Sequence, residues 1–93
     1  MIIATCIWAT LTFYALTCGS ADDAAYGGRV IPGETCAVSH DLSYLHGKII
    51  SIDGVGDRLV NDKMGPGQIN KIDLASFGNE YAEQNQKEVK VCW

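Results

Sequence analysis

The sequence predicts a small α+β fold, in which an antiparallel β-sheet carries one helix near the carboxyl terminus and a single disulfide ties the first strand to the last. Three observations lead to this prediction. Residues 49–52 are rich in β-branched side chains and residues 88–93 alternate apolar and polar, as strands do. Apolar residues recur at helical spacing between 74 and 86. A cysteine stands near each end of the region 35–93.

The amino-terminal segment 1–21 has the pattern of a secretory signal peptide. All charged side chains lie after Ala21, and the run from Ile2 to Leu16 holds none. Spanning a bilayer takes about 20 apolar residues, so this shorter run favours a cleaved leader over a retained anchor or a buried core helix. A lipoprotein site at Cys18 is a further alternative, but Ala15 is a poor match at the position three residues before it. We therefore expect an extracellular protein with no membrane span after cleavage, a flexible arm at 22–34 and a folded domain at 35–93.

The positions of the cysteines predict a stabilising disulfide in this small domain. Cleavage would remove Cys6 and Cys18 and leave Cys36 and Cys92. Two cysteines in an oxidising compartment have one intramolecular pairing, so we expect the disulfide Cys36–Cys92. The alternative is a pair of free buried thiols. No C-x-x-C spacing occurs, which argues against a zinc ribbon or a thioredoxin-like redox pair.

Local patterns place the elements of the domain. The expected strands are 35–38, 42–53, 55–61, 68–72 with Ile69 inward, and 88–93, and the expected helix is 74–86 with Asp73 as its cap. A turn at 53–54 makes the second and third strands a hairpin, with Arg58 and Val60 on one face and Leu59 on the other. Residues 39–46 are also compatible with a helical turn that begins at Ser39 and ends at Gly47.

Composition excludes several function classes. The net charge is −4 and the basic residues form no stripe, so we expect no nucleic-acid partner. The segment 53–57 resembles half of a calcium loop, but Val55 occupies a position that needs an oxygen donor. No serine stands in a G-x-S-x-G context. We therefore predict no metal, no cofactor and no enzymatic activity.

A few side chains remain as candidates for a binding surface: His40, Tyr44, His46, Arg58 and Trp93. On one strand, the spacing of the two histidines would place both imidazoles on the same face, where they could act in acid–base catalysis with Arg58 as the cation. An exposed tyrosine or tryptophan would anchor a partner protein or a sugar ring.

These observations favour a small secreted, non-enzymatic binding protein, for example an effector, a toxin-like protein or an inhibitor, whose partner is a protein or glycan outside the producing cell. In layout, residues 35–93 resemble the small single-disulfide β-rich effectors secreted by plant-associated fungi. The order of strands and helix is also similar to bacterial toxin B-subunits of the oligonucleotide/oligosaccharide-binding fold. That similarity gives an oligomeric lectin-like carbohydrate-binding subunit as the alternative. A small secreted ribonuclease-like hydrolase that uses the histidines is the second alternative.

Overall fold

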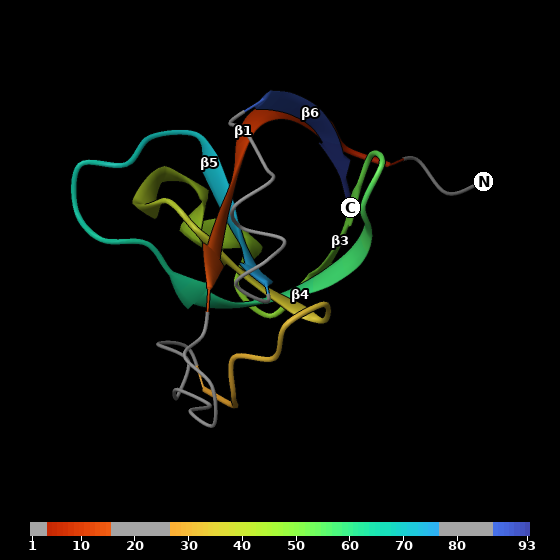
Figure 1. Ribbon diagram of the computed structural model, residues 1–93. Coiled ribbons are helices and arrows are strands. Elements are labelled where there is room, and N and C mark those ends of the chain that lie inside the picture. Colours follow the sequence, from red (N-terminus) through yellow and green to blue (C-terminus); the bar gives the residue numbers. More distant parts are fainter. Residues whose placement is uncertain (1–3, 16–26, 77–86) are drawn as a thin grey trace.

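The computed structural model describes residues 4–15, 27–76 and 87–93, which build a closed six-stranded β-barrel (Figure 1). In chain order the elements are β1 (Cys6–Ala15), β2 (Thr35–Val38), the 3-10 helix η1 (His40–Leu45), β3 (Ile49–Ile52), β4 (Gly56–Lys63), β5 (Lys71–Ser76) and β6 (Lys87–Cys92). Around the barrel the strands follow the order β1-β5-β2-β4-β3-β6. The first strand therefore lies between two strands from the carboxyl-terminal half of the chain.

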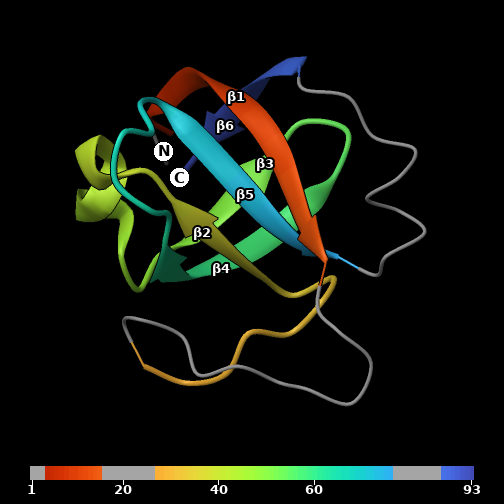
Figure 2. The same ribbon diagram turned by 60° about the vertical axis from the view of Figure 1, so that its left-hand side comes forward.

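The barrel combines parallel and antiparallel pairs. Strands β1 and β5 run parallel, as do β2 and β4, whereas the other neighbouring strands are antiparallel. Figure 2 shows β1, β5, β2 and β4 side by side. We call these four strands the wall. Because parallel neighbours cannot be joined by a tight turn, every parallel pair in the wall links distant parts of the sequence.

Alternation along the strands fills the barrel with apolar side chains. On β1, Ala9 and Leu11 are fully buried, and Ile72 and Leu74 face them from β5. Helix η1 adds buried leucines at one end of the barrel. The remaining buried core members are Cys36, Val38, Leu42, Leu45, Ile50, Ile52, Val60, Val89 and Val91.

The predicted α+β class is wrong, because the described residues form a barrel with mixed strand pairing and η1 as their helix. Residues 74–76, expected to begin a helix, belong to β5, and Asp73 pairs across the strands instead of capping a helix. The segment 71–76 alternates polar and apolar side chains until Ala75, and this period of two matches a strand. The rest of the predicted helix, 77–86, lies outside the described residues.

The amino-terminal segment supplies a barrel strand. Residues 6–15, within the predicted leader 1–21, form β1 and pair with β5 on one side and β6 on the other. A chain cut after Ala21 would lack this strand and could not close the same barrel. Cleavage itself stays a prediction. No helix among the described residues is long and apolar enough to cross a membrane.

Part of the expected flexible arm 22–34 packs on the barrel. Val30 is buried, and the side-chain amide of Asn61 on β4 donates to the carbonyl of Arg29 at 2.9 Å. The backbone N–H of Ile31 donates to the hydroxyl of Thr35 at 2.9 Å. Residues 27–34 therefore cover the outer side of β2 and β4, while residues 22–26 lie outside the described range.

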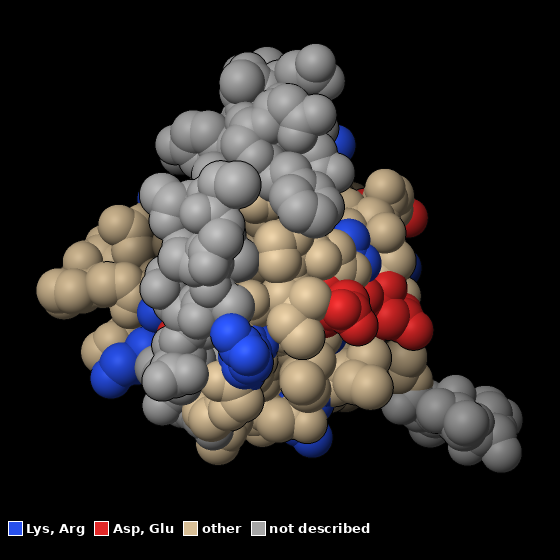
Figure 3. Space-filling model, turned by 60° about the horizontal axis from the view of Figure 1, so that its bottom comes forward, with Lys and Arg blue, Asp and Glu red and all other residues tan. Residues whose placement is uncertain are grey.

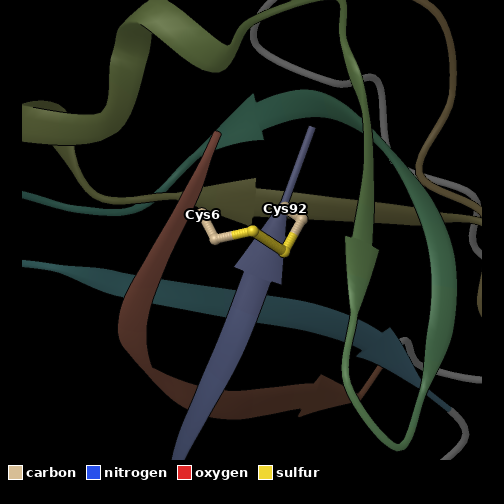
Figure 4. Close-up of a disulfide and its surroundings, with 2 residues drawn as sticks. All are labelled: Cys6 and Cys92. Atoms are coloured by element: carbon tan, nitrogen blue, oxygen red, sulfur yellow. A yellow bond between two sulfur atoms is a disulfide. The ribbon is translucent and has the colours of Figure 1, made fainter. Parts of the chain in front are cut away.

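The disulfide joins Cys6 to Cys92, so the expected pairing of Cys36 with Cys92 is wrong (Figure 4). Cys6 and Cys92 are direct partners in the antiparallel pair of β1 and β6, with their Cα atoms 4.1 Å apart. Cys36 is a buried free thiol on β2, whose neighbours are β4 and β5. It faces the barrel interior and β6 is beyond its reach.

Other local predictions are confirmed. The strand 35–38 is present, and 49–52 and 56–63 form the expected hairpin, in which Val60 is buried and Leu59 exposed. The helical alternative for 39–46 is confirmed as well, because η1 follows Ser39 and Gly47 has a φ of 81°. The expected inward position of Ile69 is wrong, since its side chain is 73% exposed.

Candidate functional site

A row of side chains crosses the outer face of the wall. Thr12 on β1 is the direct partner of Asp73 on β5, Asp73 is the partner of Ala37 on β2, and Ala37 is the partner of Asp62 on β4. We call these four residues the polar row. They lie on the outer face because the residues that flank Thr12, Asp73 and Ala37 on their strands point into the barrel. The small side chain of Ala37 separates the two carboxylates.

The carboxyl group of Asp73 is the most perturbed acid in this row. Its environment raises the pKa above the ordinary value for aspartate, chiefly because burial disfavours the charged form. The hydroxyl of Thr12, which donates to Oδ1 of Asp73 at 2.6 Å, acts in the opposite direction. The negative charge of Asp62 raises the pKa further, and the cation of Lys71 lowers it. A half-buried acid with a raised pKa makes this face a candidate functional site.

The outer face continues along β1 toward a tryptophan. Thr10, Thr12 and Trp8 share this face because side chains two apart on a strand point the same way. Thr10 is the partner of Lys71 on β5 and of Glu88 on β6. Trp8 is 62% exposed, an unusual state for the largest apolar side chain. Thr12 lies four positions after Trp8, which corresponds to about 13 Å along an extended strand.

A hydrogen-bonded loop fixes the tryptophan end of this face. The side-chain amide of Asn70 donates to the carbonyl of Trp8 at 2.9 Å, and the N–H of Thr10 donates to the carbonyl of Asn70 at 2.9 Å. The N–H of Asn70 donates to both carboxylate oxygens of Asp41 on η1, at 3.1 and 3.0 Å. Asn70 adopts a positive φ of 53°, which asparagine tolerates better than most residues. These contacts hold Asn70 against both β1 and η1.

The acid that anchors this loop is held in its charged form. The pKa of Asp41 is lowered below its ordinary value, chiefly by a hydrogen bond from the Ser39 side chain and also by the Asn70 N–H. The Ser39 oxygen in turn accepts the N–H of Lys71 at 3.0 Å. Helix η1 and the first residue of β5 are therefore linked by side-chain contacts as well as by the backbone.

Two of the side chains proposed from the sequence come together. The rings of Tyr44 on η1 and Trp93 after β6 lie with their centroids 5.9 Å apart and their planes tilted by 58°. Tyr44 is 56% exposed, and Trp93 packs partly against the core. This aromatic pair belongs to the end of the barrel that η1 covers, where the backbones of Thr5 and Trp93 also exchange hydrogen bonds.

The two histidines do not share a strand. His40 is the first residue of η1 and His46 follows its last residue, so the premise that placed both imidazoles on one strand face is wrong. A role for His40 or His46 in binding stays a prediction. Within residues 4–15, 27–76 and 87–93 no group of three or more His, Cys, Asp and Glu side chains could hold a metal ion.

Arg58 lies elsewhere, at one end of the barrel, where its Nη1 donates to the carbonyl of Asp57 at an exposed position. It is the direct partner of the buried Ile50 across the hairpin, so the two side chains lie on the same, inner face. Its guanidinium opposes a rise in the pKa of the Cys36 thiol, which burial brings to about 12. Arg58 is therefore separate from both the polar row and the aromatic pair.

Sequence reasoning missed Trp8 and the polar row. Thr12 and Trp8 were assigned to a leader, and Asp73 was assigned to a helix cap. The signal that identifies them is alternation: polar and apolar residues take turns in 10–13 and again in 71–74, each with the period of a strand.

Figure 3 shows how the charged side chains are placed on one face of the molecule. On the face shown in Figure 3, most visible acidic side chains form one patch, whereas the basic side chains lie at separate places. The basic residues visible on this face therefore form no continuous track of the kind that binds a phosphate backbone.

Comparisons with known proteins identify a similar fold. No protein-family model matches the sequence, and no curated protein matches it. Among solved structures, the crystal structure of an apo expansin from Clavibacter michiganensis matches with a TM-score of 0.68 and 14% sequence identity. The likeness lies in the fold. The match covers 94% of this chain and 49% of the expansin, so the chain spans about half the length of that protein.

Proposed function

We propose that this protein is an extracellular, non-enzymatic binding protein whose ligand is a glycan chain laid along the outer face of β1 and its neighbour β5. The observation that carries this proposal is the exposed Trp8 on the same strand face as Thr12, which hydrogen-bonds Asp73. An exposed indole offers an apolar plane for the face of a sugar ring. Carboxylates and hydroxyls accept and donate the hydrogen bonds that sugar hydroxyls need.

The dimensions of this face favour an extended ligand. Trp8 and the polar row are about 13 Å apart along β1, and Thr10 lies between them. A single small molecule cannot contact both ends at once. The loop contacts through Asn70 hold the backbone of Trp8 in place before a ligand arrives, which lowers the entropy lost on binding.

The disulfide supports an extracellular location. Bridges of this kind form and persist in oxidising compartments, and Cys6 and Cys92 are bonded here. A protein partner, an oligomeric lectin-like assembly and a role for Tyr44 remain as other outcomes of the binding experiment.

Glycoside hydrolysis is a second candidate function. Many glycoside hydrolases use one protonated carboxyl group as a general acid and a second carboxylate as base or nucleophile. The raised pKa of Asp73 and the presence of Asp62 on the same row match that requirement in kind. For hydrolysis, Asp73 and Asp62 are better candidates than His40 and His46, because the two acids lie on one row of the barrel surface.

Binding of the oxidised full chain to insoluble cellulose, chitin and xylan tests the proposal. We expect binding to at least one of these glucose-, acetylglucosamine- or xylose-based polymers. Trp8→Ala should weaken it about tenfold or more, as removal of a buried aromatic contact does at interfaces. Ile49→Ala removes another exposed apolar side chain and serves as the matched control, and Tyr44→Ala tests the alternative site on η1. Equal weakening by all three variants, or no binding to any polymer, would contradict the proposal.

The same samples separate the two candidate functions. Binding without release of new reducing ends supports the non-enzymatic proposal. Release of reducing ends that is lost in Asp73→Asn, with binding retained, supports hydrolysis instead.

A further inference from the structure

The contact between Asn70 and Trp8 uses a side chain where a regular sheet would use the backbone. The parallel ladder of β1 and β5 begins with Thr10 opposite Lys71, and the N–H of Thr10 donates to the carbonyl of Asn70. If this ladder continued by one step, the N–H of Asn70 would donate to the carbonyl of Trp8. That N–H donates instead to the carboxylate of Asp41, and the side-chain amide of Asn70 takes its place on the Trp8 carbonyl.

The backbone of Asn70 is held in the conformation that this exchange requires. Its φ of 53° is not that of a strand, so its N–H turns away from β1 and toward η1. Asp41, which accepts this N–H, is fixed in turn by the side chain of Ser39, a fully buried residue. The Ser39 oxygen also accepts the N–H of Lys71 at 3.0 Å. Asn70 is therefore oriented by groups that belong to the packed part of the barrel.

Trp8 depends on the Asn70 amide for support on one side. On the other side, β6 pairs with β1 directly, with Lys90 opposite Trp8. No residue of β5 pairs with Trp8, because that ladder begins at Thr10. The indole itself is 62% exposed and receives little packing from its neighbours. The direction of the ring is therefore set by the backbone of Trp8, and the Asn70 amide fixes this backbone on the β5 side.

A second asparagine makes the same kind of bond elsewhere and offers a comparison. The side-chain amide of Asn61 on β4 donates to the carbonyl of Arg29 at 2.9 Å, the same length as the bond from Asn70 to Trp8. Asn61 is buried, whereas the bond from Asn70 is exposed, so water can replace the Asn70 amide at little cost to folding. In the barrel, β5 and β2 separate β4 from β1. Loss of the Asn61 bond should therefore affect stability but not Trp8.

We propose that Asn70 is a positioning residue of the glycan-binding face: its amide, oriented by Asp41, fixes the β1 backbone so that the indole of Trp8 is directed outward before a sugar ring arrives. The ligand in this proposal rests on the proposed function, but the order of the Trp8 ring can be measured without any ligand. A ring that is already ordered spares the cost of ordering it on binding, which corresponds to about three- to tenfold in affinity for one side chain.

Nuclear magnetic resonance relaxation of the indole N–H groups in the oxidised full chain tests the role of Asn70. The chain has two tryptophans, so Trp93 is an internal reference. Asn70→Gly accepts the positive φ and removes the amide, and Asn70→Asp keeps the shape of the side chain but loses the donor. We expect both variants to lower the order parameter of the Trp8 indole and to leave that of Trp93 unchanged. Asn61→Ala, the matched control, should change neither.

Titration of the same proteins with cellohexaose, chitohexaose and xylohexaose measures the effect on binding. We expect the affinity for the oligosaccharide that the parent chain binds to fall about three- to tenfold in both Asn70 variants and to stay at the parent value in Asn61→Ala. A parent chain that binds none of the three contradicts the proposed function, while the order of the Trp8 ring still decides the role of Asn70. An unchanged Trp8 order parameter, an equal change at Trp93 or in Asn61→Ala, unchanged affinity in the Asn70 variants of a binding parent, or loss of folding in both would overturn the proposal.

Discussion

The β1–β5 pair joins strands that are distant in the sequence, whereas the β3–β4 hairpin joins neighbouring strands. Thr12 and Asp73 meet across the first pair although 61 positions separate them in the chain, whereas Ile52 and Gly56 are joined by a tight turn. Their outer faces differ as well. The β1–β5 pair presents hydroxyls, a carboxylate and a tryptophan, while the hairpin presents the paired apolar side chains Ile49 and Leu59. The polar side chains and the exposed tryptophan therefore lie on the pair of strands whose partners are distant in the sequence.

This difference predicts where the protein is fragile. The hairpin has a local turn and needs little loop closure, but β1 is held by distant partners and by the bridge from Cys6 to Cys92. Changes in β1 or in its bridge should therefore unfold the barrel, and changes on the outer face of the hairpin should not.

The largest effect is expected from removal of β1. A chain that begins at Asp22 lacks a strand whose Ala9 and Leu11 are fully buried and leaves β5 and β6 with open edges. We expect no cooperative thermal unfolding transition by circular dichroism. A truncated chain that unfolds at the same temperature as the full chain would show that β1 is dispensable.

The next largest effect concerns the cysteines. Cys6→Ala opens a loop closed by residues 86 positions apart, which should cost roughly 4 to 5 kcal/mol of unfolding free energy by loop-closure entropy. Cys36→Ala, the matched variant, removes one buried sulfur and should cost only about 1 kcal/mol. Denaturant titrations of both variants measure the difference, and the reverse order would indicate that Cys36 takes part in the bridge.

Asp73 should make stability depend on pH. Its folded pKa is raised above the unfolded value, so its favourable contribution is complete below that unfolded value, near 4, and is lost as the pH rises through the folded pKa. Asp73→Asn removes this titration but keeps an oxygen for the Thr12 hydroxyl. We expect the variant to lose less stability than the parent chain over that pH range, as followed by thermal unfolding from pH 4 to 7.

Asp41 behaves oppositely and supplies the control. Its pKa is lowered in the folded state, so its contribution is present above the unfolded value and is lost as the pH falls through the folded pKa. Asp41→Asn should flatten the acid side of the stability profile below pH 4. The same profile in both variants would mean that neither carboxyl is perturbed as described.

The smallest effect is expected on the hairpin's outer face. Ile49 is 64% exposed, so Ile49→Thr should change the unfolding free energy by less than about 0.5 kcal/mol. Ile50, the next residue along, is fully buried, and Ile50→Ala should cost about 2 to 5 kcal/mol. Denaturant unfolding of the two variants compares the faces of one strand directly.

The same contrast explains which features the sequence could predict. The hairpin, the strand 35–38 and the turn that begins at Ser39 depend on local patterns, and all three are present. The β1–β5 pairing depends on distant partners, and no local pattern specifies a parallel neighbour. The uncharged run before Ala21 matched a leader because a strand that is buried on its inner face and carries threonine and tryptophan outside also lacks charge.

The assignment of residues 1–21 to a leader also determined which site residues the sequence could suggest. Once residues 1–21 were set aside, Cys6, Trp8 and Thr12 could not be considered, and Cys36 became the apparent partner of Cys92. Tyr44 and Trp93 were named from the sequence because an exposed tyrosine or tryptophan would anchor a partner, and the structure brings their rings together. The pKa of Asp73 could not be anticipated because it depends on burial and on Asp62, which reaches the row only through the fold.

Disulfide mapping by mass spectrometry of protein isolated from its natural source tests most directly whether β1 belongs to the folded barrel. Proteolysis of the alkylated, unreduced protein should release a peptide that contains Cys6 linked to one that contains Cys92, with Cys36 carrying the alkyl group only after denaturation. A chain that begins at residue 22 with Cys36 linked to Cys92 would contradict the barrel and the binding face built on it.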